Sequence, residues 1–252
     1  MWGRLRGSVI DWLSRGWIVR KQCRVLTLRA KVALALFLLI AAMMVARGVH
    51  PFLAITEPVG AQVLIVEGWI PERAYVEVAD VYRHGGYAHL LVVVGVYDGD
   101  DLYDGSFYDD YLRSVVVKQG VPAESVRVVI APVTRRDRTH HGARVARRFL
   151  VDSGQSLESV DVATLGAHAR RTRLLYQQAF GDQTEVGIVA LAEQTYDTQH
   201  WWRYSAGIRD VFSETLGYGY ARFFFRPPDP PEDDAPFEIP ERRNQGRLDP
   251  RA

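Results

Sequence analysis

Cysteine is nearly absent from this chain of 252 residues, because Cys23 is the only one. A single cysteine forms neither an intramolecular disulfide nor a thiolate metal cluster, which excludes a disulfide-built scaffold. An excess of one charge sign is also lacking, since 31 basic residues face 30 acidic ones and the net charge is +1. A chain without a strong overall charge has no general attraction to nucleic acid, and we predict no nucleic-acid partner.

The glycine signatures of several large enzyme classes are missing as well. The chain contains no G-x-G-x-x-G, no G-x-x-x-x-G-K-[ST] and no G-x-S-x-G. Rossmann-type NAD(P) binding and α/β-hydrolase chemistry therefore lack support, and the sequence identifies no cofactor. One acidic loop, with Asp98, Asp100, Asp101 and Asp104, has the oxygen ligands of Mg²⁺ or Ca²⁺, but acidic loops are common and we assign no metal ligands.

One long apolar run is present near the amino terminus, at 32–46. At 1.5 Å per residue it reaches roughly 22 Å, and continuing the helix to Leu53 covers the ~30 Å hydrocarbon core of a bilayer. The preceding segment 1–31 is basic, which predicts a cytoplasmic amino terminus and an extracytoplasmic remainder. We predict a single-pass anchor at 32–53 in a bacterial inner (plasma) membrane, and a cleaved signal peptide is the alternative.

After a linker at 54–60, apolar runs alternate with helical patterns over an extracytoplasmic domain at 61–225. This alternation predicts an α/β fold: a Rossmann-like three-layer αβα sandwich with a mainly parallel sheet of about five strands, preceded by one N-terminal transmembrane helix. Proline and charge dominate 226–252, which predicts a disordered tail. The expected strands are 61–66, 90–96, 125–130, 159–165 and 185–191, and the helices after them begin near Pro71, Tyr108, Thr139, Ala167 and Trp201.

The candidate site lies in the loops after the strands, because ligands of such sheets collect at the carboxyl ends of the strands. Two of these loops open helices, whose free N–H groups suit an anion. We predict an electropositive rim that binds an anionic ligand, with His168 as general acid or base. Plainer explanations stay open, since arginines pair with surface acids and loop histidines are often simply solvated. The predicted ligand-binding residues are Gly68, Arg138, Thr139, His141, Arg170 and Arg171.

Several segments resemble the YdcF/SanA/ElyC-like family of bacterial proteins. They are VLIVEGWIPERA, GGYAHLLVVVG, RTHHGARVARRFL, TLGAHARRTRLLYQQAFG and HWWRYSAGIRDVFSE, and they span roughly 62–220. The EGW-x-P, HARR and WWR features look like one subgroup of that family. The resemblance implies a Rossmann-like domain behind one membrane helix and a role in envelope biogenesis, such as peptidoglycan or lipid-carrier metabolism.

The resemblance carries over only part of the family's site. The family's histidine and arginine after the fourth strand fall on His168 and Arg171, its threonine falls on Thr139, and its glycine turn falls near Gly68. Where the family often has Glu-Asn after that threonine, this chain has the dipeptide at 141–142, His-Gly. The departure removes polar groups and puts a shared catalytic role in doubt.

Three functions follow as expectations. The first is an enzyme acting on a phosphorylated or anionic envelope precursor, either a peptidoglycan precursor or a lipid carrier. The second is a non-catalytic module that binds the same anionic small-molecule or lipid-linked ligand. The third is a membrane-tethered interaction protein whose contact surfaces are Trp201, Trp202 and the tail. In each case the membrane is a partner through residues 32–53.

Overall fold

The computed structural model of this chain describes residues 26–95, 105–132, 134 and 137–227, without the side chains of 105–108. The acidic loop and the tail from 228 onward, on which two of the predictions above depend, lie outside the described residues. The chain divides into two units, Met1–Val45 and Ala46–Ala252, which are described separately.

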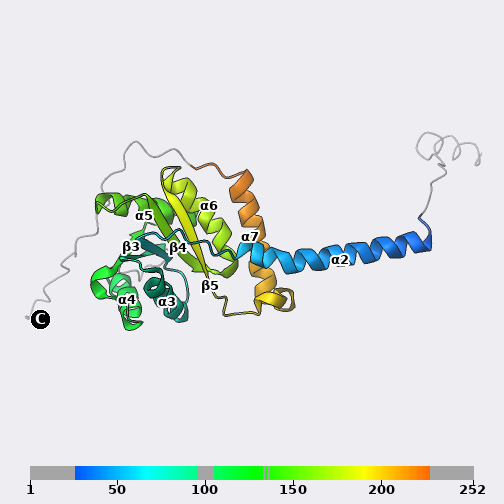
Figure 1. Cartoon of the computed structure of the whole chain (residues 1–252), viewed down its shortest axis with the longest axis horizontal. Coiled ribbons are helices and arrows are strands. Elements are labelled where there is room, and N and C mark those ends of the chain that lie inside the picture. Colours follow the sequence, from blue (N-terminus) through cyan, green and yellow to red (C-terminus); the bar gives the residue numbers. More distant parts are fainter. Residues whose placement is uncertain (1–25, 96–104, 133, 135–136, 228–252) are drawn as a thin grey trace, which may run out of the picture. The chain divides into compact units, whose positions relative to one another are not determined.

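The amino-terminal unit is built on the apolar helix α2, Leu28–Leu53 (Figure 1). Its side chains between 28 and 45 are almost all exposed. Over the described residues it is the one helix long and apolar enough to cross a membrane. The prediction of an N-terminal apolar helix is therefore confirmed, while its orientation stays a prediction. Its last residues, 46–53, belong to the second unit.

The second unit contains a sheet of five parallel strands in the order β3-β2-β1-β4-β5. The strands are β1 (Val63–Glu67), β2 (His89–Gly95), β3 (Val126–Ala131), β4 (Ser159–Leu165) and β5 (Glu185–Leu191). The predicted α/β fold with a parallel sheet is thus confirmed, and β4 and β5 have the predicted bounds. Strand β1 begins two residues later than expected, because the Ala61 N–H donates to the Asp161 carboxylate and not to a neighbouring strand.

Helices cover both faces of this sheet (Figure 1). Successive strand residues point to opposite faces, so Leu64 and Val66 enter one apolar core while Val63 and Ile65 enter the other. The first core is closed by α3 and α4, and the second by α5 and α6. The helices are α3 (Tyr75–Gly85), α4 (Gly105–Lys118), α5 (Arg138–Asp152), α6 (Ala169–Phe180) and α7 (Ser205–Phe223), with short 3-10 turns η1 (Glu72–Ala74), η2 (Ala123–Ser125), η3 (Gly166–His168) and η4 (Thr198–Arg203).

The strand order reverses between β1 and β4. The chain runs outward from β1 through β2 to β3, and then returns to the other side of β1 to form β4 and β5. The loops after β1 and β4 therefore leave the sheet in opposite directions and open a crevice between them. Glu67 ends β1, and Gly166 and His168 follow β4, so these residues lie at that crevice.

A buried carboxylate ties the segment before β1 to the sheet. Asp161 on β4 is fully buried and accepts hydrogen bonds from the N–H groups of Val59 (2.8 Å) and Ala61 (3.1 Å) and from the Tyr87 hydroxyl (3.0 Å). A Cβ on Gly187 would lie 1.8 Å from Asp161 Oδ1, so only glycine fits there. The residues just before β1 are thus fastened to β4 by one acidic side chain.

Candidate functional site

A pocket of about 640 Å³ opens at the carboxyl edge of the sheet, over the crevice between β1 and β4. Residues far apart in the chain meet in it, because β1, α5, η3, α6 and α7 all contribute to its wall. The charged and polar side chains that matter below are Glu67, Arg138, Thr139, His168, Arg171, Glu193, Asp210 and Glu214, with Trp69 at its edge.

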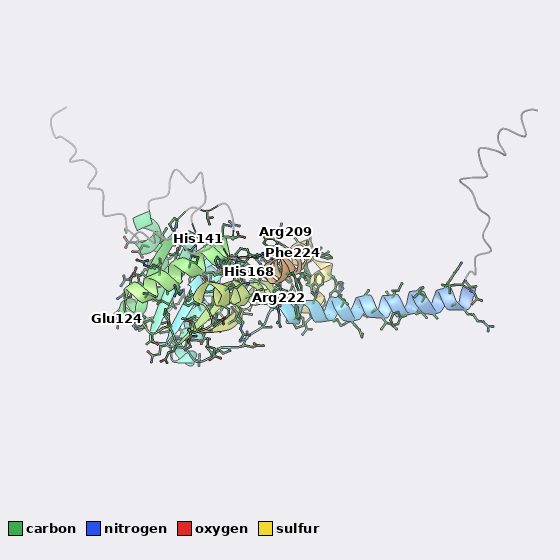
Figure 2. The ribbon with its side chains drawn as sticks, turned by 90° about the horizontal axis from the view of Figure 1, so that it is seen from above. Glu124, His141, His168, Arg209, Arg222 and Phe224 are labelled. Carbon is green, nitrogen blue, oxygen red and sulfur yellow. The ribbon has the colours of Figure 1, made fainter. Side chains whose placement is uncertain are left out.

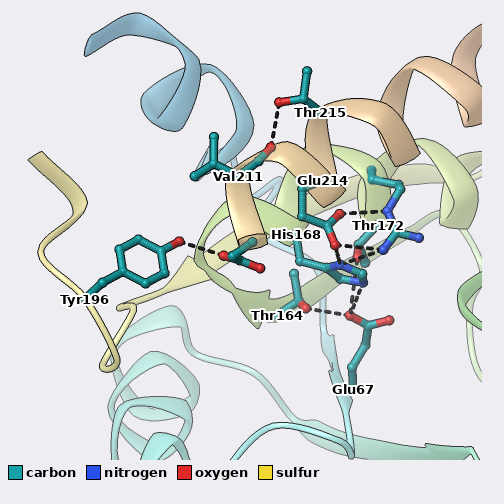
Figure 3. Close-up of polar contacts among 10 residues, drawn as sticks. Glu67, Thr164, His168, Thr172, Tyr196, Val211, Glu214 and Thr215 are labelled. Carbon is teal, nitrogen blue, oxygen red and sulfur yellow. Dashed lines mark hydrogen bonds and ion pairs between the residues drawn. The ribbon is translucent and has the colours of Figure 1, made fainter. Parts of the chain in front are cut away.

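His168 lies in the pocket wall between two carboxylates (Figure 3). Its Nδ1 is 3.0 Å from Glu214 Oε1, and its Nε2 is 3.5 Å from Glu67 Oε2. Nε2 is buried and has no hydrogen-bond partner among the described residues. The Trp69 ring meets the imidazole edge-on, with centroids 5.1 Å apart. His168 is therefore held between two carboxylates, with its Nε2 buried beside Glu67.

Glu67 is positioned by two threonines from neighbouring elements. Its Oε2 accepts hydrogen bonds from the hydroxyl of Thr164 on β4, at 2.5 Å, and from that of Thr172 on α6, at 3.2 Å (Figure 3). All three side chains are buried. Because both hydroxyls converge on one oxygen, the carboxylate has a fixed orientation toward His168.

Glu214 joins α7 to α6 through a two-point contact with Arg171. The guanidinium donates from Nε to Oε2 at 2.7 Å and from Nη2 to Oε1 at 2.9 Å. Burial alone would raise the pKa of Glu214, but the hydrogen bonds and charges of His168 and Arg171 lower it to about 2. Glu214 is therefore ionised at any physiological pH.

Asp210, one turn before Glu214 on α7, has the opposite electrostatic environment. Its Oδ2 accepts a 2.6 Å hydrogen bond from the Tyr196 hydroxyl (Figure 3). Burial and the neighbouring carboxylates of Glu214 and Glu193 raise the pKa of Asp210, although the Tyr196 hydrogen bond opposes them. The pocket thus contains two acids whose pKa values are moved apart by their surroundings.

The amino-terminal end of α5 forms another part of the wall. Asp137, the residue before the helix, has a left-handed backbone with φ 51° and lines the pocket together with Arg138, Thr139 and Gly142. The first N–H groups of a helix have no partner within it, and they carry the positive end of the helix dipole. This end of the pocket combines backbone donors, a hydroxyl and a guanidinium with the carboxylate of Asp137.

Four of the residues predicted for the site line the pocket: Arg138, Thr139, His168 and Arg171. Arg170 does not, because its guanidinium lies over the Phe52 ring, 4.1 Å from the centroid, and donates to the Phe52 carbonyl.

Gly68 and His141 are likewise outside the pocket wall. The Gly68 N–H donates to the Val93 carbonyl at 2.7 Å, and a Cβ there would lie 2.8 Å from the Val94 side chain, so this glycine serves the packing of β1 on β2. His141 is half-buried on α5, where burial and the nearby Arg144 charge lower its pKa.

The expectation of an electropositive rim is wrong for the described part of the pocket. Two guanidinium groups and one imidazole meet five carboxyl side chains there, and Glu67 and Glu214 offset the charges of His168 and Arg171 directly. The expectation failed because it depended on the loops after β3 and β4, whereas the loop after β5 and helix α7 add acids to the pocket. The five acidic residues are Glu67, Asp137, Glu193, Asp210 and Glu214.

Glu214 and Trp201 are both buried side chains. Glu214 lies on the buried face of α7 with Val211 and Ala221, and an acid within an apolar helix pattern is the signal that marks it. Trp201 is only 6% exposed and donates its indole N–H to the Ala46 carbonyl at 2.7 Å, so it is a core residue and not a contact surface.

No model of a known protein family matches this chain, and no curated protein matches it in sequence. The resemblance to the YdcF/SanA/ElyC-like family therefore stays a prediction from the motifs. Among the residues that the structure describes, no group of three or more His, Cys, Asp and Glu side chains is arranged to hold a metal ion.

Proposed function

We propose that this chain is a membrane-anchored enzyme of bacterial envelope biogenesis that acts on a phosphorylated or otherwise anionic precursor. One observation carries the proposal: His168 lies in the pocket wall with a carboxylate at each ring nitrogen. An imidazole held in this way donates and recovers a proton without reorienting, as general acid–base catalysis requires. Its Nε2, which is 3.5 Å from Glu67 Oε2 and has no hydrogen-bond partner among the described residues, is the nitrogen that we assign to proton transfer.

The anionic group of the substrate fits best at the start of α5. Arg138 and Thr139 lie there at the first N–H groups of α5, which have no partner within the helix, and helix starts are common phosphate sites. The carboxylates of Glu67 and Glu214 offset the charges of His168 and Arg171, so the other end of the pocket attracts an anion less. This separation orients a phosphate ester with its phosphate toward α5 and its leaving oxygen toward His168.

Hydrolysis of a phosphate ester is the reaction that this arrangement supports. Water attacks phosphorus, the bond between phosphorus and the leaving oxygen breaks, and His168 gives its proton to that oxygen. The proton released by water passes to a carboxylate of the pocket, for which Glu67 is the candidate. Thr164 and Thr172 act as positioning residues, because they hold Glu67 and touch no reacting atom in this scheme.

The membrane anchor of the proposal is α2. Its apolar side chains, its length and the basic segment before it favour a helix that crosses the inner membrane with the amino terminus in the cytoplasm. The motif resemblance favours the same placement and an envelope substrate. On this interpretation the pocket lies outside the cytoplasm.

The direct test is turnover by the full-length protein in detergent, offered a panel of phosphate monoesters, diesters and pyrophosphates, lipid-linked ones included. We expect one class to be hydrolysed, and His168→Ala to lower kcat by about 100-fold or more. His84→Ala is the matched control, because His84 is exposed on α3 and away from the pocket. Turnover that survives His168→Ala would exclude the proposed role.

A binding module without turnover is the second candidate. It is favoured by the observation that His168, Arg171 and Glu214 also fasten α7 to η3 and α6, as a purely structural network would. Calorimetry with inorganic phosphate and pyrophosphate would then show saturable binding but no product. Arg138→Ala should weaken that binding, whereas Arg170→Ala should not, because Arg170 is outside the pocket wall.

A further inference from the structure

Helix α7 presents large apolar side chains to solvent although its opposite face is already packed on the domain. Gly207, Val211 and Ala221 are buried on the inner face. Five further side chains, which we call the outer stripe, are between 42% and 77% exposed. A helix in water hides one apolar face, so a second one needs an apolar environment of its own. The outer stripe consists of Ile208, Phe212, Leu216, Phe223 and Phe224.

The helical repeat places this stripe away from the protein core. At about 100° per residue, Phe212, Leu216 and Phe223 fall within roughly 40° of one another and nearly opposite Gly207. Their directions match their exposure, since Leu216 and Phe223 are more than two-thirds exposed. The stripe is therefore a face of the helix and not a set of scattered surface residues.

The charges around the outer stripe are basic. Arg209 and Arg222 are exposed on α7, and Figure 2 labels both on this helix, together with Phe224 just beyond its end. The only acids of α7, Asp210 and Glu214, line the pocket on the other side. An apolar face bordered by arginines, with no exposed acid, complements an anionic lipid surface.

The position of α7 in the second unit supports the same partner. The end of α2 packs beside it, because Leu53 and Val211 share one core cluster and the Phe52 and Tyr218 rings meet at 5.7 Å (Figure 1). The Trp201 indole, just before α7, donates to the Ala46 carbonyl at 2.7 Å. Residues 46–53 span only about 10 Å of helix, so the chain between the apolar run and the part of α2 that contacts α7 is short.

We propose that the outer stripe of α7 lies in the headgroup region of an anionic phospholipid bilayer, as a second membrane contact of this chain. The proposal rests on the membrane anchor of the proposed function. Since the inner face of α7 lines the pocket with Asp210 and Glu214, the pocket then opens beside the bilayer. A substrate held in the membrane by a lipid chain reaches such a pocket without leaving the membrane.

The test uses the full-length protein in vesicles of phosphatidylcholine with or without phosphatidylglycerol. Single cysteines are placed in a Cys23→Ser background and carry a fluorescent bimane label. Leu216→Cys reports on the outer stripe, and Val151→Cys, an exposed apolar position at the far end of α5, is the matched control. Leu38→Cys reports on the middle of α2. Lipids with a nitroxide at the headgroup or deep in the acyl chain act as quenchers.

Headgroup nitroxides should quench the Leu216 label to about half in anionic vesicles and leave the Val151 label unchanged. Adding Arg209→Glu and Arg222→Glu should restore most of the Leu216 fluorescence, because the attraction to anionic lipid is reversed. Phe212→Cys repeats the measurement one turn away and protects the result against a local defect at Leu216.

Three results would overturn the proposal. If the Leu38 label is quenched by deep nitroxides but the Leu216 label matches Val151, α7 lies off the bilayer while the anchor stands. If Leu38 is not quenched, the anchor itself is wrong and α7 loses its reason to meet lipid. If the Leu216 label is shielded from water but not quenched by lipid, a second copy or another segment of this chain covers the stripe.

Discussion

Arg171 on α6 and Glu214 on α7 form a two-point ion pair, with N···O distances of 2.7 and 2.9 Å, and His168 Nδ1 lies 3.0 Å from the same carboxylate. Glu214 is 7% exposed, so water screens this cluster little. One carboxylate therefore supports the fold, by joining two helices, and the site, by holding His168. Changes to α7 should consequently affect stability and activity together.

Glu214→Gln should lower the free energy of unfolding at pH 7 by on the order of 3 kcal/mol. The pKa of Glu214 is lowered to about 2 in the folded protein, against an ordinary value of 4.5. The stabilisation is therefore complete above about pH 4.5 and disappears as the pH falls through about 2. Urea unfolding of the full-length protein in detergent, at pH 7 and pH 3, should show a smaller difference between wild type and variant at pH 3. Glu124→Gln, at an exposed position, is the control, and an equal effect there would contradict the assignment.

Asp210→Asn should have the opposite sign. Burial and the carboxylates of Glu214 and Glu193 raise the pKa of Asp210, so ionising it opposes folding at neutral pH. A raised carboxyl pKa favours the folded state at low pH, and this advantage is lost as the pH rises through the folded pKa. The amide keeps an acceptor for Tyr196 and removes the charge. The variant should be more stable than wild type at pH 7 and no more stable at pH 3; a loss of stability at pH 7 would refute this account.

Alanine substitutions at two glycines of α7 distinguish a gain in helix propensity from a disturbance of the Arg171–Glu214 ion pair. A Cβ on Gly217 would lie 3.0 Å from Arg171 Cδ and Nε, whereas a Cβ on Gly219 would meet nothing within 4 Å. Gly219→Ala should therefore stabilise the protein by about 0.5–1 kcal/mol. Gly217→Ala gains the same propensity but displaces Arg171, so it should stabilise less and weaken ligand binding. Thermal unfolding and phosphate calorimetry compare the two variants. Equal stability and equal phosphate affinity would show that the Arg171 side chain moves aside without cost.

Substitutions at Asp161 and at one of its hydrogen-bond donors measure how much this carboxylate stabilises the segment before β1. Asp161→Ala leaves the N–H groups of Val59 and Ala61 and the Tyr87 hydroxyl without their acceptor, and should cost about 3–5 kcal/mol. Tyr87→Phe removes one donor only and should cost about 1 kcal/mol. Denaturant unfolding measures both values, and similar losses would mean that the backbone contacts contribute little.

Much of the fold follows from local patterns in the chain. The run 185–191 is apolar at nearly every position and the run 159–165 at four of seven, as is typical of parallel strands covered on both faces, and both strands have those bounds. Helix α5 begins at Arg138, within one residue of its predicted start. Such a start can be predicted because a helix is specified by residues only a few positions apart in the chain. The same pattern predicted that the site lies at the carboxyl ends of the strands, since strands joined by helices run parallel and end at one edge of the sheet.

The contents of the site depended on tertiary structure, and Arg170 and Arg171 show the reason. They are adjacent on α6, yet a rotation of about 100° directs one to the Phe52 ring and the other to Glu214. Nothing in the local pattern ranks one above the other. The side chain that distinguishes them comes from α7, which follows only after another strand and a loop.

The sequence by itself determined the apolar amino-terminal helix, the alternation of strands and helices, and the presence of His168 after β4. Only the tertiary structure decided that Glu67 and Glu214 meet that histidine, and that the pocket is mixed in charge and not basic. The physical reason is the distance along the chain over which each property is encoded. Helix and strand periodicity is encoded over a few residues, whereas the charge of a pocket is a sum over side chains that approach one another only after folding.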